Sequence, residues 1–330
     1  MARMTLRDFA KSKDPNGAQA QVIEMLEQYN PMLQDAPAYA ANAPYGNRTT
    51  YRRSLPSVGT VKINKGVSPT KSTTDQRVDT IGIFSGRSEV DSRIQKVEGT
   101  AAMATKRRSE LNGLQEAMSQ LVAQNLAYGD TKLDEASFTG LAPRMASLNA
   151  GASVILPQVW SSGSVSGSDG CSVYIVDWGE YAAKLIYPPN TIAGMDVADK
   201  GEEKVTDAAG GTFYVLAQTI EWFVGLSVED PRHIGRLANI DLSDALLDSP
   251  TQGVLFDRLE QMMDIMPVVG PNQRVMYCPN RLYSAFRKQA RAKSNLALTL
   301  EQYLGQLVPH LWGVPVRKMD QLSITESTVS

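Results

Sequence analysis

The sequence has few of the residues that build disulfides and metal sites. Among its 330 residues are two cysteines and two histidines. Cys171 and Cys278 lie far apart, without ligand spacing around them, so we expect two buried free thiols and no disulfide. Zinc needs cysteines or carboxylates at ligand spacing from a histidine, and His233 and His310 have no such neighbours. We expect His233 in a satisfied polar corner, His310 at the surface or in a subunit contact, and no metal or cofactor.

Long apolar segments are also absent. No apolar run approaches the ~20 residues that a helix needs to span a bilayer. Residues 1–14 are polar and lack the apolar region of a signal peptide. Because 42% of the residues are apolar and 21% are charged, the composition is that of a globular chain. We therefore expect a soluble protein made in the cytoplasm, with no membrane partner.

Motifs of catalysis and phosphate binding are missing as well. The glycine-rich segment 161–170 lacks the Lys-Ser/Thr pair of a P-loop and runs into a strand instead of a helix. No Gly-x-Ser-x-Gly motif accompanies the histidines, and the carboxylates of segment 196–203 do not follow the order of a calcium-binding loop. We therefore predict no catalytic residues; an enzyme with an unrecognised site is a distant alternative.

Charge is nearly balanced overall but unevenly distributed. The net charge of −2 argues against a protein that mainly grips phosphates, because such proteins are usually clearly basic. Residues 48–77 contain seven basic residues and one acid, whereas residues 196–264 contain fourteen acids and five bases. A basic segment and an acidic one can attract each other between copies of the chain; two solvated faces that never meet are the alternative.

One stretch, residues 212–241, organises the rest of the chain. Apolar residues alternate through its middle, at Ile220, Trp222, Val224, Leu226 and Val228. This period of two predicts a strand with one face on a core. From 213 to 228 the strand would run roughly 50 Å at ~3.3 Å per residue, whereas ordinary strands have ~5–6 residues. Such a length favours an elongated subunit over a compact enzyme; an ordinary sandwich strand is the alternative.

Residues 48–92 predict a long two-stranded hairpin, with strands at about 50–63 and 76–85. Short apolar alternations flank turn residues at 65–69, at Val58, Val61 and Ile63 and then at Val78, Ile81 and Ile83. A lone two-stranded hairpin is only marginally stable in water, so we expect this one to lie on a neighbouring molecule. The alternative is a disordered basic loop.

Helical and strand periodicities mark further segments. We predict a helix over 100–127, roughly 40 Å long at ~1.5 Å per residue, with a glycine cap at Gly129. Its apolar face holds Leu111, Leu114, Met118, Leu121, Val122 and Leu126. Further helices are predicted at 15–29, 253–266, 280–292 and 299–307, and strands at 171–178, 184–187, 274–278 and 313–318. We expect an extended arm over 31–47 and a turn-rich acidic excursion over 190–211.

These segments together resemble a tailed-bacteriophage major capsid protein of the Hong Kong 97 type. Four of them look like a podovirus group that includes the Bordetella phage coat protein: TLRDFAKSKDPNGAQAQVIEMLEQYNPML, RRSLPSVGTVKINKGV, SVYIVDWGEYAAKLIYP and WFVGLSVEDPRHIGRLANID. The end, RVMYCPNRLYSAFRKQA and LWGVPVRKMDQL, is similar to the end of the apical domain across this fold. The order and spacing of the segments, rather than any single motif, carry the likeness.

The resemblance implies an α+β, Hong Kong 97-like fold in five parts. They are an N-terminal arm, residues 1–47; an extended β-hairpin loop, 48–98; a peripheral domain, 99–241, with a spine helix at 100–127 and long strands; an α/β axial domain, 242–318; and a C-terminal tail, 319–330. Coats with a built-in scaffold begin with a long helical segment before the arm, which this sequence lacks. A separate scaffolding protein, or assembly without one, is therefore implied.

The resemblance also implies a function. It is self-assembly into the hexamers and pentamers of an icosahedral phage head around double-stranded DNA, which is held without sequence specificity. The implied partners are further copies of the chain, a portal protein, a cement or decoration protein and the packaged DNA. The protein would be made in the host bacterial cytoplasm and reside in the virion capsid. The alternative is a nucleic-acid-binding protein that uses the basic segment 48–77, whose binding would fall steeply with salt.

The basic residues of the hairpin are the candidate contacts between subunits. Charge pairing fixes the register between subunits better than it adds affinity. We therefore predict that these residues meet carboxylates of an adjacent subunit. The candidates are Arg48, Arg52, Arg53, Lys62 and Arg77.

Overall fold

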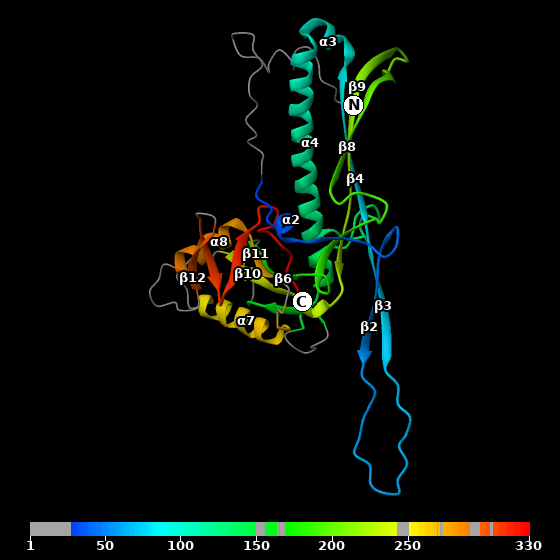
Figure 1. The fold of residues 1–330 in the computed structure, drawn as a ribbon. Helices are drawn as coiled ribbons and strands as arrows, with labels where there is room; N and C mark the ends of the chain where they lie inside the picture. Colours follow the sequence, from blue (N-terminus) through cyan, green and yellow to red (C-terminus); the bar gives the residue numbers. More distant parts are fainter. Residues whose placement is uncertain are drawn as a thin grey trace.

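The molecule is elongated, with a long helix beside long strands, a lobe of shorter elements and a hairpin that projects from the body (Figure 1). The computed structural model describes residues 28–149, 156–163, 165, 169–242, 251–268, 270, 273–290, 298–303 and 306–330. Within these ranges, no helix combines the length and the apolar character needed to cross a bilayer.

A single mixed sheet of twelve strands connects the two ends of the body. Its hydrogen-bonded path runs through β12 (Leu298–Tyr303), β13 (Gln306–Leu311), β14 (Val314–Lys318), β11 (Gln273–Cys278), β6 (Gly170–Trp178), β7 (Ala183–Tyr187), β9 (Thr212–Val228) and β4 (Gly82–Asp91). Four strands attach beside this path: β1 (Ala38–Ala40) on β7, β10 (Ile234–Asp241) on β6, β5 (Gln158–Ser161) on β10, and β8 (Met195–Thr206) on β9.

The predicted long strand is β9, which has 17 residues and lies between β4 and β8. Ile220, Val224, Leu226 and Val228 are buried in the main core, as the alternation predicts. Trp222 packs against that core but stays only partly buried. The strand ends where predicted: Asp230 caps a short 3-10 turn, η1 (Pro231–His233), by accepting a hydrogen bond from the Arg232 amide.

Strand β8 replaces the turn-rich excursion expected over 190–211. It pairs antiparallel with β9 from the pair Met195–Trp222 to the pair Thr206–Thr212. None of its residues is buried, so its side chains carry no apolar period that sequence reading could detect. Backbone hydrogen bonds to β9, rather than a core of its own, make this segment a strand. The expected turns remain on both sides of β8: at residues 188–194, where the Thr191 amide donates to the Pro188 carbonyl, and at 207–211, where the Asp207 amide donates to the Gly211 carbonyl.

The predicted helix over 100–127 is α4 (Thr100–Tyr128), which follows the short helix α3 (Ser92–Glu98). Met118, Val122 and Leu126 are buried as expected, but Leu121 is 47% exposed. The helix ends at Gly129, whose amide donates to the Asn125 carbonyl. That glycine has an ordinary negative φ of −54°. A Cβ at this position would lie 2.5 Å from the Phe138 carbonyl oxygen, so close backbone approach requires glycine here.

The C-terminal lobe is only partly as predicted. The helices α7 (Thr251–Ile265) and α8 (Asn280–Ala290) and the strands β11 and β14 lie where expected. The predicted helix over 299–307 is wrong, because β12 and β13 form an antiparallel hairpin there. Strand β11 pairs with β6, which makes the sheet of this lobe continuous with that of the rest of the subunit.

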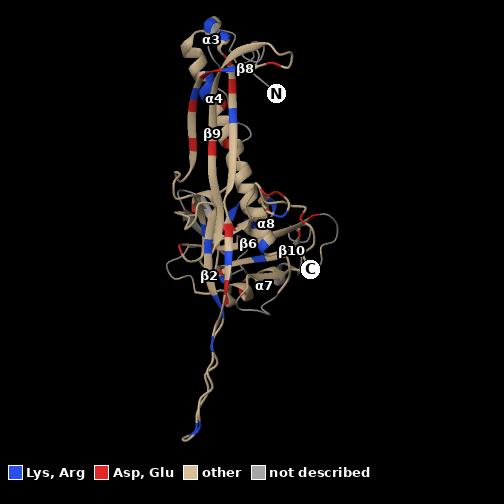
Figure 2. Cartoon of the chain, turned by 90° about the vertical axis from the view of Figure 1, so that its right-hand side faces the viewer, with Lys and Arg blue, Asp and Glu red and all other residues tan. Residues whose placement is uncertain are grey.

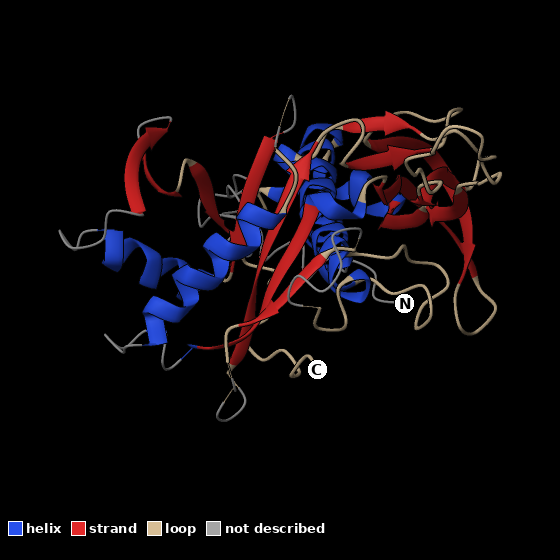
Figure 3. Cartoon of the chain, turned by 90° about the horizontal axis from the view of Figure 1, so that it is seen from below, coloured by secondary structure: helices blue, strands red, loops and turns tan. Residues whose placement is uncertain are grey.

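Strand β6 separates two hydrophobic cores. All nine of its residues are buried. Tyr174 and Val176 belong to the core that contains α4, whereas Val173 and Ile175 belong to the core that contains α7 and α8. Seen from below, helices lie on either side of the strands (Figure 3). Cys171 and Cys278 are buried free thiols, as predicted, and burial raises the pKa of Cys171 to about 12.

The segment that precedes the hairpin packs on the body. Most of the predicted helix over 15–29 lies outside the described residues, and its last two residues, 28 and 29, are not helical. Within the expected extended arm, residues 32–35 instead form a short helix, α2 (Met32–Asp35), whose Met32 is buried in the main core. The Asp35 carboxylate accepts a hydrogen bond from the Tyr277 hydroxyl at 2.7 Å, which ties α2 to the sheet. The short helix α5 (Leu141–Arg144) follows α4.

Candidate functional site: the projecting hairpin and its anchor

The predicted hairpin exists, but its strands are shorter and begin earlier than expected. β2 (Gly46–Ser54) and β3 (Thr73–Thr80) form an antiparallel two-stranded sheet, and residues 55–72 join them without regular structure. The expected strand limits of 50–63 and 76–85 are therefore corrected. Residues 82–91 belong to β4, which pairs with β9 along the body. In Figure 1 the hairpin extends well beyond every other element.

Apolar side chains are exposed along the segment between the two strands, which we call the tip, residues 55–72. Exposure reaches 94% at Val58 and 93% at Ile63, and Leu55, Val61 and Val67 are also exposed. Large apolar side chains gathered on one projecting loop have no core to join within the subunit. Exposed apolar surface of this kind marks contact with another molecule.

The five predicted contact residues all lie on the hairpin. Arg48, Arg52 and Arg53 are on β2, Lys62 is in the tip and Arg77 is on β3; all are exposed except Arg77, which is half-buried. Among the described residues, none of the five has an ion-pair partner. Figure 2 shows basic residues at intervals along the hairpin, to its far end.

The base of the hairpin is anchored by a buried carboxylate that sequence reasoning missed. Asp79, at the end of β3, is only 3% exposed. One of its oxygens lies 2.8 Å from Nη1 of Arg144, and the other accepts hydrogen bonds from the Ser227 hydroxyl at 3.0 Å and the Val228 amide at 3.1 Å. Burial lowers the pKa of Arg144, and the neighbouring Asp79 carboxylate opposes that shift.

Further polar contacts join the start of β2 to the same point of the body. The Asn47 side-chain amide donates to the Ser227 hydroxyl at 3.0 Å and to the Glu229 carboxylate at 3.4 Å, and that carboxylate also lies 2.6 Å from Nζ of Lys184. At Gly46 a Cβ would lie 2.2 Å from the Asp79 carbonyl oxygen, so only glycine fits between the two strands. The hairpin thus leaves the body through a rigid, buried junction.

The acidic strand β8 is partly neutralised within the subunit. Asp199 pairs with Arg107 of α4 at 2.7 Å, and Glu203 pairs with Arg87 of β4 at 2.5 Å. The hydrogen bond from Arg107 lowers the pKa of Asp199. Asp196 and Glu202 are exposed, and among the described residues they have no ion-pair partner. They are therefore candidate acceptors for basic residues of another copy.

The polar corner expected around His233 is present. Its Nδ1 lies 2.7 Å from the buried carboxylate of Asp177, which also accepts two hydrogen bonds from Arg274, at 2.6 and 2.9 Å. His310 is half-buried, with Nδ1 3.1 Å from the Val308 carbonyl oxygen. Across the described part of the chain, no cluster of His, Cys, Asp and Glu has the arrangement of a metal site.

Comparison with known proteins shows the family to which the chain belongs. The model of the family described as major capsid protein GP7 matches residues 14–330. The chain belongs to this family. It is therefore a major capsid protein, the subunit of an icosahedral phage head, and the function predicted from the sequence is confirmed. None of the curated proteins matches the sequence.

Solved structures agree with the family and with the predicted fold class. A chain of the bacteriophage Epsilon15 structure, determined by cryo-EM and modeling, superposes with a TM-score of 0.78 and 26% identity, covering 100% of this chain and 97% of that chain. The bacteriophage JBD30 capsid gives a TM-score of 0.51 at 10% identity, over 90% of this chain and 93% of that chain, and so supports the fold alone. The predicted Hong Kong 97-like α+β fold is confirmed.

Proposed function

We propose that the projecting hairpin joins capsid subunits to one another by lying on an adjacent copy. The observation that carries this proposal is the exposed apolar tip at the end of a two-stranded sheet that touches the body only at its base. A lone hairpin of two strands buries too little surface to be stable in water. Docking on a second copy would cover the side chains of Leu55, Val58 and Ile63, and would add the burial that the isolated subunit lacks.

Charge pairs set the alignment of the hairpin on the neighbouring subunit. Arg48, Arg52, Arg53, Lys62 and Arg77 stand on the hairpin, and we propose that they pair with carboxylates of the neighbouring subunit. The exposed acids of β8 and β9 are suitable acceptors, among them Asp196, Glu202 and Glu221. Exposed pairs contribute only ~0–1 kcal/mol each, so the apolar tip supplies most of the affinity and the charges select the alignment.

The remaining expectations from the sequence fit this role. We propose hexamers and pentamers as the assembly units, with residues 1–47 as the arm, 48–98 as the extended loop, 99–241 as the peripheral domain, 242–318 as the axial domain and 319–330 as the tail. Other proposed partners are a portal protein, a separate scaffolding protein, a cement protein and the packaged double-stranded DNA. We further propose synthesis in the host bacterial cytoplasm and a structural role that needs no catalytic step.

Removing the tip tests the proposed contact. Ser54 and Thr73 are register partners at the end of the paired strands, so residues 55–72 can be replaced by Asn-Gly, which favours a two-residue hairpin turn. We expect this variant to fold as a soluble subunit and to form no shells in sedimentation and negative-stain electron microscopy.

A second variant separates loop length from side-chain chemistry. It replaces residues 55–72 by a Gly/Ser segment of the same length, and we expect it to fail in assembly as the short variant does. Normal shells from both variants would show that the tip is not the contact between subunits. The chain would remain a capsid protein by family, because that conclusion does not depend on the hairpin.

A further inference from the structure

The last residues of the chain, 319–330, cross the sheet and return to the main core. Met319, Leu322 and Val329 are buried there. The Glu326 amide donates to the Gly170 carbonyl at 2.8 Å, and the Leu148 amide donates to the Ser330 carbonyl at 3.3 Å. The segment has no strand of its own, so these separate contacts hold it in place.

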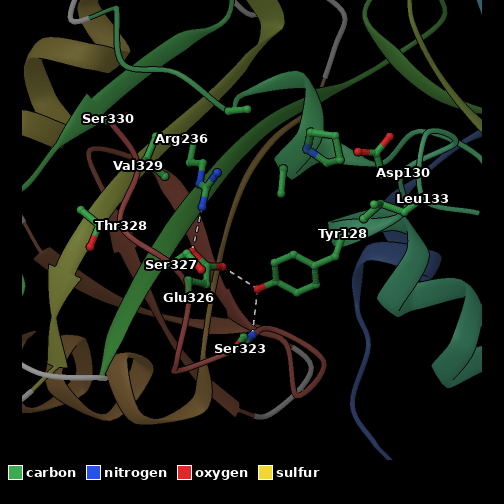
Figure 4. Close-up of a pocket in the computed structure, with 13 residues that line it drawn as sticks. Tyr128, Asp130, Leu133, Arg236, Ser323, Glu326, Ser327, Thr328, Val329 and Ser330 are labelled. Carbon is green, nitrogen blue, oxygen red and sulfur yellow. Dashed lines mark hydrogen bonds and ion pairs between the residues drawn. The ribbon is translucent and has the colours of Figure 1, made fainter.

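One buried carboxylate in this segment contacts three different elements. Oε1 of Glu326 accepts hydrogen bonds from the hydroxyls of Tyr128, the last residue of α4, at 2.5 Å, and of Tyr174 on β6 at 3.2 Å. Oε2 lies 2.9 Å from Nη2 of Arg236 on β10 and also accepts from the Ser172 hydroxyl on β6. Figure 4 shows Glu326 between Arg236 on one side and Tyr128 on the other.

A second residue of the tail also contacts the end of α4. The Ser323 amide donates to the Tyr128 hydroxyl oxygen at 2.8 Å, so this hydroxyl donates to Glu326 and accepts from Ser323 at once (Figure 4). Burial raises the pKa of Tyr128 well above its ordinary value, as do the nearby Tyr174 and Glu326. The phenol therefore keeps the proton that it donates.

An irregularity in the backbone of β10 brings a side chain of that strand against the end of the tail. The pairing of β10 with β6 shifts between Leu237 and Ile240, and Asn239 within the shift has a φ of +57°. Asparagine tolerates this left-handed conformation better than most residues. Its side chain pairs with the backbone of Val329, donating to the carbonyl and accepting from the amide at 2.8 Å each. The side chain thus acts as a strand partner for the tail.

The tail and the side chains that hold it border a cavity of about 490 Å³. Its lining includes Tyr128, Arg236 and Glu326 as well as the tail residues Ser327 and Thr328. Ser327, Thr328 and Ser330 are exposed. Solvent therefore reaches the end of the tail beside the side chains that hold it.

From this geometry we propose that residues 319–330 are a detachable clasp, which fixes the C-terminal end of α4 to the sheet through Glu326. The clasp acts as one unit because Ser323 and Glu326 hold Tyr128 while Asn239 holds Val329. Glu326 is a positioning residue: it sets where α4 ends relative to β6 and β10. This role is separate from the hairpin contact and does not depend on it.

Native-state amide hydrogen exchange of the full-length, unassembled subunit tests the clasp. In Glu326→Gln we expect the amides of Ser323, Glu326 and Val329, and those of the last turn of α4, to exchange about tenfold to a hundredfold faster, because charge-assisted hydrogen bonds are lost. Exchange in β4 and β9 is expected to stay unchanged. Glu180→Gln makes the same chemical change at an exposed position and is expected to leave these exchange rates unchanged.

Asn239→Gly provides an independent variant that leaves Glu326 intact. Glycine adopts the positive φ without strain, so the substitution removes the two hydrogen bonds to Val329 and one to the Ser161 hydroxyl oxygen. We expect faster exchange at Ser323 and Glu326 as well as at Val329, because the clasp opens as one unit. Faster exchange at Val329 alone, or an unchanged last turn of α4 when the tail opens in Glu326→Gln, would overturn the proposal. Tyr128→Phe replaces Glu326→Gln if the latter fails to fold.

Discussion

At the scale of single residues, buried charges hold the subunit together at points that sequence reading does not reveal. Asp79 and Arg144 are 65 positions apart in the chain and both are almost fully buried. In the sequence, Asp79 looks like one more polar residue of the predicted hairpin, residues 48–92. Its role follows from tertiary contacts with Ser227 and Val228 of β9, and nothing in its local sequence indicates them.

Removing the Asp79 charge tests the anchor of the hairpin. In Asp79→Asn, the Arg144 guanidinium stays buried without a counter-charge. We expect the free energy of unfolding to fall by about 3–5 kcal/mol, measured by urea denaturation of unassembled subunits. Asp75→Asn is the matched control, since Asp75 lies on the same strand but is exposed, and we expect a change within about 0.5 kcal/mol. Equal effects of the two substitutions would contradict a buried anchor.

Asp177 gives the fold a predictable acid sensitivity. Burial alone would raise the pKa of this carboxyl, but hydrogen bonds from Arg274 and His233 outweigh burial and lower it below its ordinary value of 3.8. A carboxyl whose pKa is lower in the folded state stabilises the fold above the unfolded pKa. That stabilisation is lost as the pH falls through the folded pKa. The relevant window therefore lies below pH 3.8.

We expect Asp177→Asn to be less stable than the parent at pH 7, with a difference that shrinks as the pH falls below 3.8. The measurement is the free energy of unfolding from urea titrations at a series of pH values. Curves for the parent and the variant that stay parallel through this window would show that Asp177 is not the group responsible.

At the scale of elements, sequence patterns succeeded where one element carries its own long period. The helix α4 and the strand β9 were predicted within about two residues at each end, because a helical apolar stripe at 111–126 and a strand alternation at 220–228 lie within them. β8 was missed because its partner β9, and not its own side chains, makes it a strand.

The hairpin limits were wrong because the alternation at Val58, Val61 and Ile63 faces no core in the subunit. The five candidate contact residues were placed on the hairpin as expected, but whether they meet another subunit stays a prediction.

Two glycines, Gly113 within α4 and Gly129 at its C-terminal end, test how local geometry determines the change in stability when a methyl group is added. In Gly129→Ala the new Cβ would meet carbonyl oxygens of Phe138 and Asn125 at 2.5 and 2.7 Å. We expect a loss of about 1–3 kcal/mol in the free energy of unfolding, since backbone must move. In Gly113→Ala nothing lies within 4 Å of the new atom, and we expect a gain of up to about 1 kcal/mol from helix propensity. Thermal unfolding that moves the same way in both variants would refute this account.

At the scale of the whole molecule, the subunit consists of a body and a projecting hairpin that carries net positive charge. The body neutralises part of its own acidic strand through Arg87 and Arg107. The hairpin, whose strand β2 carries Arg52 and Arg53, projects outward with basic residues along it (Figure 2). A shell repeats each contact between subunits many times. Weak pairs, each worth ~0–1 kcal/mol, can therefore decide whether subunits align, even though one pair hardly stabilises one subunit.

Reversing these charges tests whether they align the subunits. Arg52→Glu with Arg53→Glu changes exposed side chains only, so we expect normal folding but few shells. The defect is expected to be strongest at roughly 0.1 M salt and weaker at roughly 1 M, because the screening length falls from about 10 Å to about 3 Å. Lys96→Glu with Lys132→Glu is the control, since both lysines are exposed and lie outside the hairpin. Sedimentation at both salt concentrations distinguishes the outcomes. Full shells from the arginine variant at low salt would remove the proposed charge pairing, whereas equal defects in both double variants would indicate a general effect of net charge.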